Sequence, residues 1–65
     1  MTSNGPPLLP VGKTKIFGTS GDQYEVGEAI GPLDDDDWLI EVTIVKTGEK
    51  AEYRWRDMIK DPDAP

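Results

Sequence analysis

The chain has 65 residues, enough for one small domain, and its 13 acidic and 7 basic residues give a formal net charge of −6. The absence of cysteine and histidine excludes a disulfide framework, a thiolate metal site and the usual general base near neutral pH. No apolar run is long enough to span a membrane, and an acidic surface repels nucleic acid and anionic lipid. We therefore expect a cytoplasmic protein that is not an enzyme, needs no cofactor and binds neither nucleic acid nor membrane.

Residues 1–10 contain three prolines and few groups that could pack, so we expect a disordered or loosely packed tail. The alternative is that the aliphatic side chains of this region fold back and cover one end of the core, namely Leu8, Leu9 and Val11. Residues 11–62 are expected to form a single small β domain, and residues 63–65 are expected to fray.

The first candidate strand, residues 13–17, is short and lies between two glycines. Its alternation of polar and apolar residues is imperfect, and we expect both Ile16 and Phe17 to be at least partly buried. The residues that follow it have the composition of a loop.

The next candidate strand, residues 23–30, has a clearer pattern, with Tyr24 and Val26 alternating with polar residues. Ile30 would face the same side of this strand as Tyr24 and Val26, but so would the charged Glu28. Because Gly27 precedes that mismatch, we predict a β-bulge or a close backbone approach at this point. Gly31-Pro32 is expected to end the strand.

Residues 38–46 and 50–56 predict a β-hairpin with Gly48 in its turn, and this hairpin should form the centre of the sheet. The hydrophobic parity favours one register, which would make Tyr53 and Trp55 core residues. The expected pairs are Ile44 with Ala51, Val42 with Tyr53, Ile40 with Trp55 and Glu41 with Arg54. A looser loop of four residues would keep the same parity.

A single helical turn is expected after Arg56, with Asp57 as its cap and with Met58 and Ile59 directed to the core. The turn should stop at Asp61, because the residue before a proline disfavours helix.

The fold class that follows is mainly β: a small antiparallel four-to-five-stranded curled sheet, or an SH3-like barrel, with a short C-terminal helical turn. The sheet must curl because the chain has no long amphipathic helix to cover an apolar face. The outline resembles an SH3-like barrel in its strand pattern alone. The aromatic and proline motifs of peptide-binding SH3 domains are missing, so no binding residues are carried over from that resemblance.

The candidate binding residues are the four consecutive aspartates before the hairpin and the tryptophan after them: Asp34, Asp35, Asp36, Asp37 and Trp38. Carboxylates beside an aromatic ring suit the recognition of Lys or Arg through ionic and cation–π contact. We expect these carboxylates to be solvated, so that removing their charge leaves the stability unchanged or slightly higher. Asp35 and Asp37 are weak candidates for calcium, since the run lacks the ligand spacing of an EF-hand.

No motif in the chain identifies an activity. The interpretation that the sequence favours is a small non-enzymatic protein-interaction module whose acidic loop meets a basic protein or peptide. Two alternatives stay open: an acidic decoy that mimics nucleic acid, and a weak calcium-binding domain. The acidic run could also serve solubility alone. The chain is expected to be a monomer or a weak dimer, since an exposed edge strand allows pairing.

Overall fold

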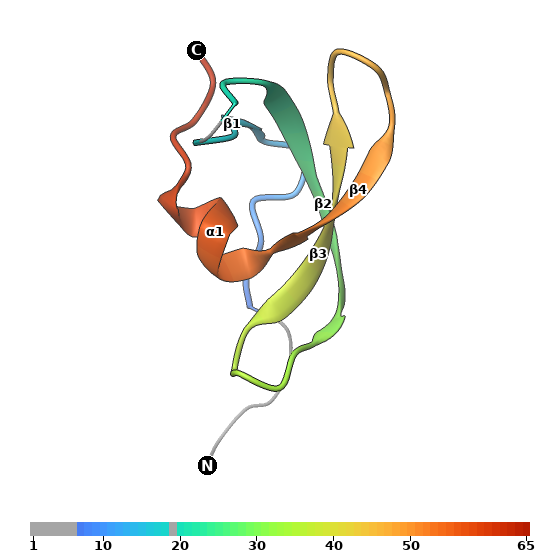
Figure 1. Ribbon diagram of the computed structural model, residues 1–65, viewed down its shortest axis with the longest axis vertical. Coiled ribbons are helices and arrows are strands. Elements are labelled where there is room, and N and C mark those ends of the chain that lie inside the picture. Colours follow the sequence, from blue (N-terminus) through green and yellow to red (C-terminus); the bar gives the residue numbers. More distant parts are fainter. Residues whose placement is uncertain (1–6, 19) are drawn as a thin grey trace.

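The computed structural model describes residues 7–18 and 20–65. Four strands form one antiparallel sheet in the order β1-β2-β3-β4, and a short helix follows the last strand (Figure 1). The elements are β1 (Thr14–Ile16), β2 (Gln23–Pro32), β3 (Trp38–Ile44), β4 (Lys50–Arg54) and α1 (Trp55–Lys60). The predicted fold class, a mainly β antiparallel sheet with a short C-terminal helical turn, is confirmed.

The sheet is strongly twisted but not closed, because β1 and β4 stand at its two ends. Of the two architectures that we predicted, the structure therefore has the open curled sheet and not the closed SH3-like barrel. Asp63 and Ala64, two of the three C-terminal residues that we expected to fray, lie beside the outer edge of β1, as does Pro62 before them. The Ile16 N–H donates to the Pro62 carbonyl at 2.9 Å, and the Ala64 N–H donates to the Thr14 carbonyl at 2.9 Å. The chain end thus satisfies backbone groups that an edge strand would leave open.

A β-bulge interrupts β2 where the sequence predicted one. The register against β3 shifts between Val26, which pairs with Val42, and Ala29, which pairs with Ile40. Tyr24 and Val26 are buried before the shift, and Ala29 packs on the core after it. The bulge turns Glu28 and Ile30 to the outer face, so the charged residue avoids the core. A second shift follows Ala29, and β2 continues to Pro32, two residues beyond its expected end.

Gly27 allows the close approach of the two backbones at the bulge. A Cβ atom at this position would lie 2.6 Å from the Glu41 carbonyl oxygen, which is backbone and cannot rotate away. We therefore predict that Gly27→Ala lowers the free energy of unfolding by about 1–3 kcal/mol, since overpacking forces the strands apart. Gly31→Ala is the matched control, because a Cβ there would meet no atom within 4 Å. Urea unfolding of both variants checks this; an equal loss of stability would contradict the steric explanation.

The register of the β3–β4 hairpin differs from our prediction by two residues. Tyr53 lies opposite Ile40, and Ala51 lies opposite Val42. Glu41 faces Glu52 rather than Arg54. The expected pairs of Val42 with Tyr53 and of Ile40 with Trp55 are therefore wrong.

The hairpin loop is the reason for this difference. The Ile44 N–H donates to the Glu49 carbonyl at 2.8 Å and the Gly48 N–H donates to the Ile44 carbonyl at 2.7 Å, so residues 45–48 form the looser four-residue loop. Gly48 takes the positive φ of 77° that the turn requires. A shift of two residues preserves parity, so each residue keeps its face while every partner changes. Trp55, expected in the strand, becomes the first residue of α1 and is only partly buried.

The core lies between the inner face of the sheet and α1. Its buried residues are Tyr24, Val26, Ile40, Val42 and Met58. Phe17, Tyr53 and Trp55 are partly buried around them. Met58 confirms the expected helical contact, but Ile59 is half-exposed. Successive residues of an α-helix point about 100° apart, and of these two only Met58 is directed to the sheet.

The segment before β1 contributes one residue to this core. Leu9 packs on it, whereas Leu8 is 99% exposed and Val11 is half-exposed. The alternative that this region folds back is therefore correct for Leu9. Our expectation of a disordered tail also concerned residues 1–6, which lie outside the described residues.

Candidate functional site

The acidic run forms the loop between β2 and β3. The Leu33 N–H donates to the Asp37 carbonyl at 2.9 Å, which closes the loop, and Asp36 has a left-handed φ of 64°. The four aspartates are not equivalent. The first three are exposed, but Asp37 is only 1% exposed.

Asp37 is a structural residue that caps α1 from a distant part of the chain. Its Oδ1 accepts from the Trp38 N–H at 2.8 Å and from the Arg56 N–H at 3.0 Å. Arg56 is the second residue of α1, so its N–H has no partner within the helix. We expected Asp57 to be the cap; this is wrong, because Asp57 lies within the first turn of the helix. The expectation of a solvated carboxylate is also wrong for Asp37.

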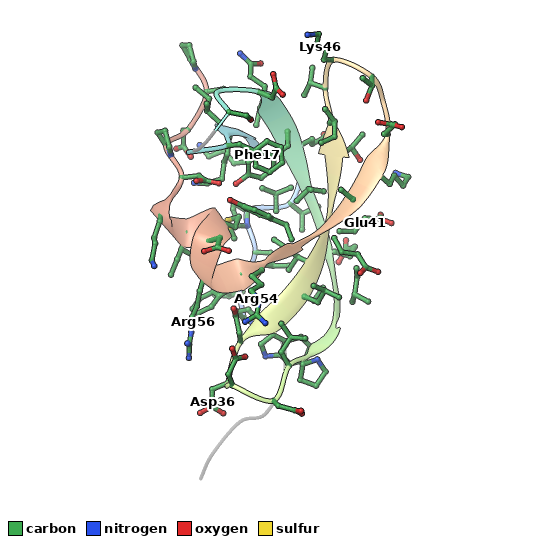
Figure 2. All side chains as sticks on the ribbon, viewed as in Figure 1. Phe17, Asp36, Glu41, Lys46, Arg54 and Arg56 are labelled. Carbon is green, nitrogen blue, oxygen red and sulfur yellow. The ribbon has the colours of Figure 1, made fainter. Side chains whose placement is uncertain are left out.

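Two arginines, Arg54 and Arg56, lie beside the β2–β3 loop (Figure 2), and both donate hydrogen bonds to Asp35. Arg54 Nη1 donates to Asp35 Oδ2 at 2.6 Å and lies 3.5 Å from Asp37 Oδ2. Arg56 Nη2 donates to the backbone carbonyl of Asp35 at 2.8 Å. The hydrogen bond from the Arg54 guanidinium lowers the pKa of the Asp35 carboxyl below its ordinary value. Both weak calcium candidates thus face the same cation, and no group of three or more acidic side chains in the described segments could hold a metal.

Asp34, Asp36 and Trp38 complete the set of candidates from the sequence. Asp34 and Asp36 are exposed, and their carboxylates take no part in the hydrogen bonds or ion pairs that the described residues make. Trp38 is partly buried at the start of β3, opposite Pro32. The loop therefore presents two available carboxylates where the sequence suggested four.

Asp61, which sequence analysis assigned only to the end of the helix, is the centre of a buried polar cluster. The hydroxyls of Tyr24 and Tyr53 both donate to its Oδ2, at 2.7 and 2.8 Å. The Gly18 N–H donates to its Oδ1 at 3.1 Å, and the residue is only 8% exposed. Three donors make burial of this carboxylate tolerable.

The two tyrosine rings of this cluster pack against each other and against Phe17. Phe17 stacks on Tyr24 with ring centroids 4.2 Å apart, and Tyr53 meets both rings edge-on, at 5.0 Å from Phe17 and 5.4 Å from Tyr24. Tyr24 belongs to β2 and Tyr53 to β4, and β3 lies between these two strands. The rings and Asp61 together join strands that share no backbone pairing.

We predict that this cluster makes the fold sensitive to alkali. Burial, and then the hydrogen bond to the Asp61 carboxylate, raise the pKa of Tyr24 and of Tyr53 well above the ordinary value of 10.0. The contribution of the two neutral tyrosines to the stability of the fold is fully present below pH 10. It is lost as the pH rises above this value, because only the unfolded chain then releases the tyrosine protons. The free energy of unfolding should fall by up to about 1.4 kcal/mol per pH unit for each tyrosine.

Thermal melting at pH values on both sides of 10 checks this, with tyrosinate absorbance as the second signal. The Tyr24→Phe variant is the control, and its loss of stability at high pH should be smaller than that of the wild type. Tyrosines that titrate at their ordinary pKa in the folded protein would contradict the prediction.

The face of the sheet opposite α1, which we call the outer face, is acidic. Figure 2 shows Glu41 on this side, directed away from α1. Its glutamates come from three strands: Glu25 and Glu28 of β2 and Glu52 of β4 are exposed, and Glu41 of β3 is partly buried. Glu41 and Glu52 lie directly opposite each other, and the single cation within reach of Glu41, among the described residues, is Lys50 at 3.9 Å.

A shallow depression of about 170 Å³ lies on the outer face beside this pair. Its lining residues are Ile30, Glu41, Lys50, Ala51 and Glu52. Ile30 is 50% exposed and supplies an apolar wall between carboxylates. In the sequence Ile30 shares the alternation of the buried Tyr24 and Val26. The bulge that the sequence predicted near Glu28 is the signal that Ile30 lies on the other face.

Comparison with known proteins places the chain in a family. Residues 2–65 match the one described as "Family of unknown function (DUF5397)". The chain belongs to this family. It is also similar to an "Uncharacterized protein" of Haemophilus influenzae (strain ATCC 51907 / DSM 11121 / KW20 / Rd), with 41% identity over 56 residues. That match covers 86% of this chain and 89% of the relative.

The match to DUF5397 spans every strand and α1, so the sheet, the outer face and the Asp61 cluster all lie within the family's extent. α1 has six residues, and no helix among the described residues is long and apolar enough to span a membrane. Neither description names a ligand, so the choice of a function depends on the surfaces of the molecule.

Proposed function

We propose that this protein is a small non-enzymatic interaction module that binds a basic protein or peptide through its acidic outer face. The observation that supports the proposal best is the placement of Glu41 directly opposite Glu52, beside the exposed Ile30. Like charges directly opposite on adjacent strands cost roughly 0.2–1 kcal/mol, so the fold gains nothing from this pair. A cation placed between the two carboxylates would be attracted to both.

The depression fits the side chain of Lys or Arg. Such a side chain has an aliphatic stem and a charged head, and Ile30 offers apolar contact for the stem while Glu41 and Glu52 lie close by for the head. Asp34 and Asp36 at the tip of the β2–β3 loop add negative charge that would attract the same partner. The proposed partner is thus the basic one that the sequence suggested, but its main contact is with the sheet and not with the β2–β3 loop.

Binding of a fluorescent Lys/Arg-rich peptide tests the proposal. The double variant Glu41→Gln/Glu52→Gln should bind about five- to thirtyfold more weakly than the wild type, since the two exposed ionic contacts together are worth about 1–2 kcal/mol. The matched control Asp22→Asn/Asp57→Asn removes the same number of charges from the β1–β2 loop and from α1, and should bind nearly as well as the wild type. Binding should also weaken as salt shortens the screening length.

Equal losses in the two double variants would mean that net charge alone attracts the peptide, which would contradict a defined site. No binding of the wild type to any basic peptide would reject the proposal. Capture of partners from a cell extract would identify the class of partner. Displacement of such partners by added DNA would favour the decoy alternative instead.

A further inference from the structure

Strand β4 is the open edge of the sheet. It stands last in the strand order, and in the part of the chain that the structure describes no backbone segment pairs with its second side. The opposite edge strand, β1, differs in this respect, because Pro62 and Ala64 cover it. Alternate residues of an edge strand direct their N–H and C=O groups away from the sheet, where a further strand can bind them.

Of the three charged side chains of β4, the acidic one is the one without an ionic partner among the described residues. Lys50, Glu52 and Arg54 alternate with Ala51 and Tyr53. Lys50 lies 3.9 Å from Glu41, and Arg54 lies 2.6 Å from Asp35, so both cations have a carboxylate partner within the chain. Glu52 takes part in none of the ion pairs among the described residues, and Glu41 stands directly behind it.

We propose that β4 binds an extended basic segment of a partner protein as an additional strand, with a Lys or Arg side chain of that segment beside Glu52. The proposal rests on the proposed function and states its binding mode. A strand added here would direct every second side chain over the outer face, next to the depression lined by Ile30 and Glu52. A second copy of this chain fits less well, because two molecules with a net charge of −6 each repel one another.

Two synthetic peptides test the binding mode with the intact protein. The first is a blocked peptide of alternating Lys and Val. The second has the same sequence but is N-methylated at alternate residues, which removes the N–H groups of one edge and keeps every charge. The first peptide should bind and should slow the hydrogen exchange of amides in residues 50–54. The second should bind at least about tenfold more weakly, since several strand hydrogen bonds at roughly 1 kcal/mol each are lost.

Charge reversal then locates the contact. Glu52→Lys should weaken binding of the first peptide at least about fivefold, whereas Asp22→Lys, an equal change of net charge in the β1–β2 loop, should have a smaller effect. Glu52→Lys relieves the repulsion from Glu41, so the variant is expected to fold.

Each other result has a defined meaning. Equal binding of the two peptides would overturn strand addition and leave the acidic-face proposal standing. Failure of both peptides to bind, together with failure of the Lys/Arg-rich peptide, would overturn both proposals. A concentration-dependent dimer that Glu52→Lys dissociates would overturn the basic partner in favour of a second copy.

Discussion

Asp61→Ala is expected to lower the free energy of unfolding by about 3–5 kcal/mol, because three hydrogen-bond donors lose their shared acceptor. The variant leaves the buried Tyr24 hydroxyl and the partly buried Tyr53 hydroxyl and Gly18 N–H without their acceptor. A chain of this length has a total stability of only roughly 3–10 kcal/mol, so the variant should be largely unfolded near 37 °C. Urea unfolding followed by tryptophan fluorescence measures the loss.

The tyrosine variants separate the hydrogen bonds from the general effect of removing the carboxylate. Tyr24→Phe and Tyr53→Phe each remove one donor and keep the ring contacts with Phe17, so each should cost about 1–2 kcal/mol. In the Asp61→Ala background the same changes should cost much less, because the hydroxyls no longer have a partner. Additive effects of Asp61→Ala and Tyr24→Phe would show that the hydrogen bond between them contributes little.

Asp37→Ala is expected to lower the free energy of unfolding by about 2–3 kcal/mol, because the helix loses its cap and a second, partly buried N–H loses its acceptor. The substitution removes the acceptor of both the Trp38 and the Arg56 N–H and leaves Arg54 with a single carboxylate partner. The helix should fray first, which would expose Met58 and lower the helical signal in circular dichroism. Thermal melting and urea unfolding give the magnitude.

The neighbouring aspartates provide matched controls. Asp34→Ala should change the stability by less than about 0.5 kcal/mol, as for most exposed positions. Asp36→Gly should raise it by up to about 1 kcal/mol, because Asp36 has a positive φ of 64° that glycine adopts without strain. If Asp34→Ala and Asp37→Ala lose the same stability, the capping role assigned to Asp37 is wrong.

Features that depend on near neighbours in the chain could be predicted from the sequence alone. Alternation with a period of two identified the strands, and the mismatch at Glu28 after Gly27 identified the bulge. Gly48 identified the hairpin turn, and Pro62 limited the helix. Each signal depends on the local steric and hydrophobic preferences of a few residues, which no distant segment overrides here. The mainly β fold followed from the sum of these signals.

The tertiary structure alone decided the pairings. Parity is the same for any offset of two residues, so it could not separate the expected pair of Glu41 and Arg54 from the observed pair of Glu41 and Glu52. The four-residue length of the hairpin loop fixes the observed register, and this register places two glutamates side by side on the outer face. The burial of Asp37 and Asp61 also depends on contacts between distant parts of the chain. An aspartate is a plausible loop residue wherever it occurs in a sequence. Asp37 can be buried because α1 approaches the β2–β3 loop and supplies the Arg56 N–H as a donor. Asp61 can be buried because tyrosines from two separate strands supply their hydroxyls as donors.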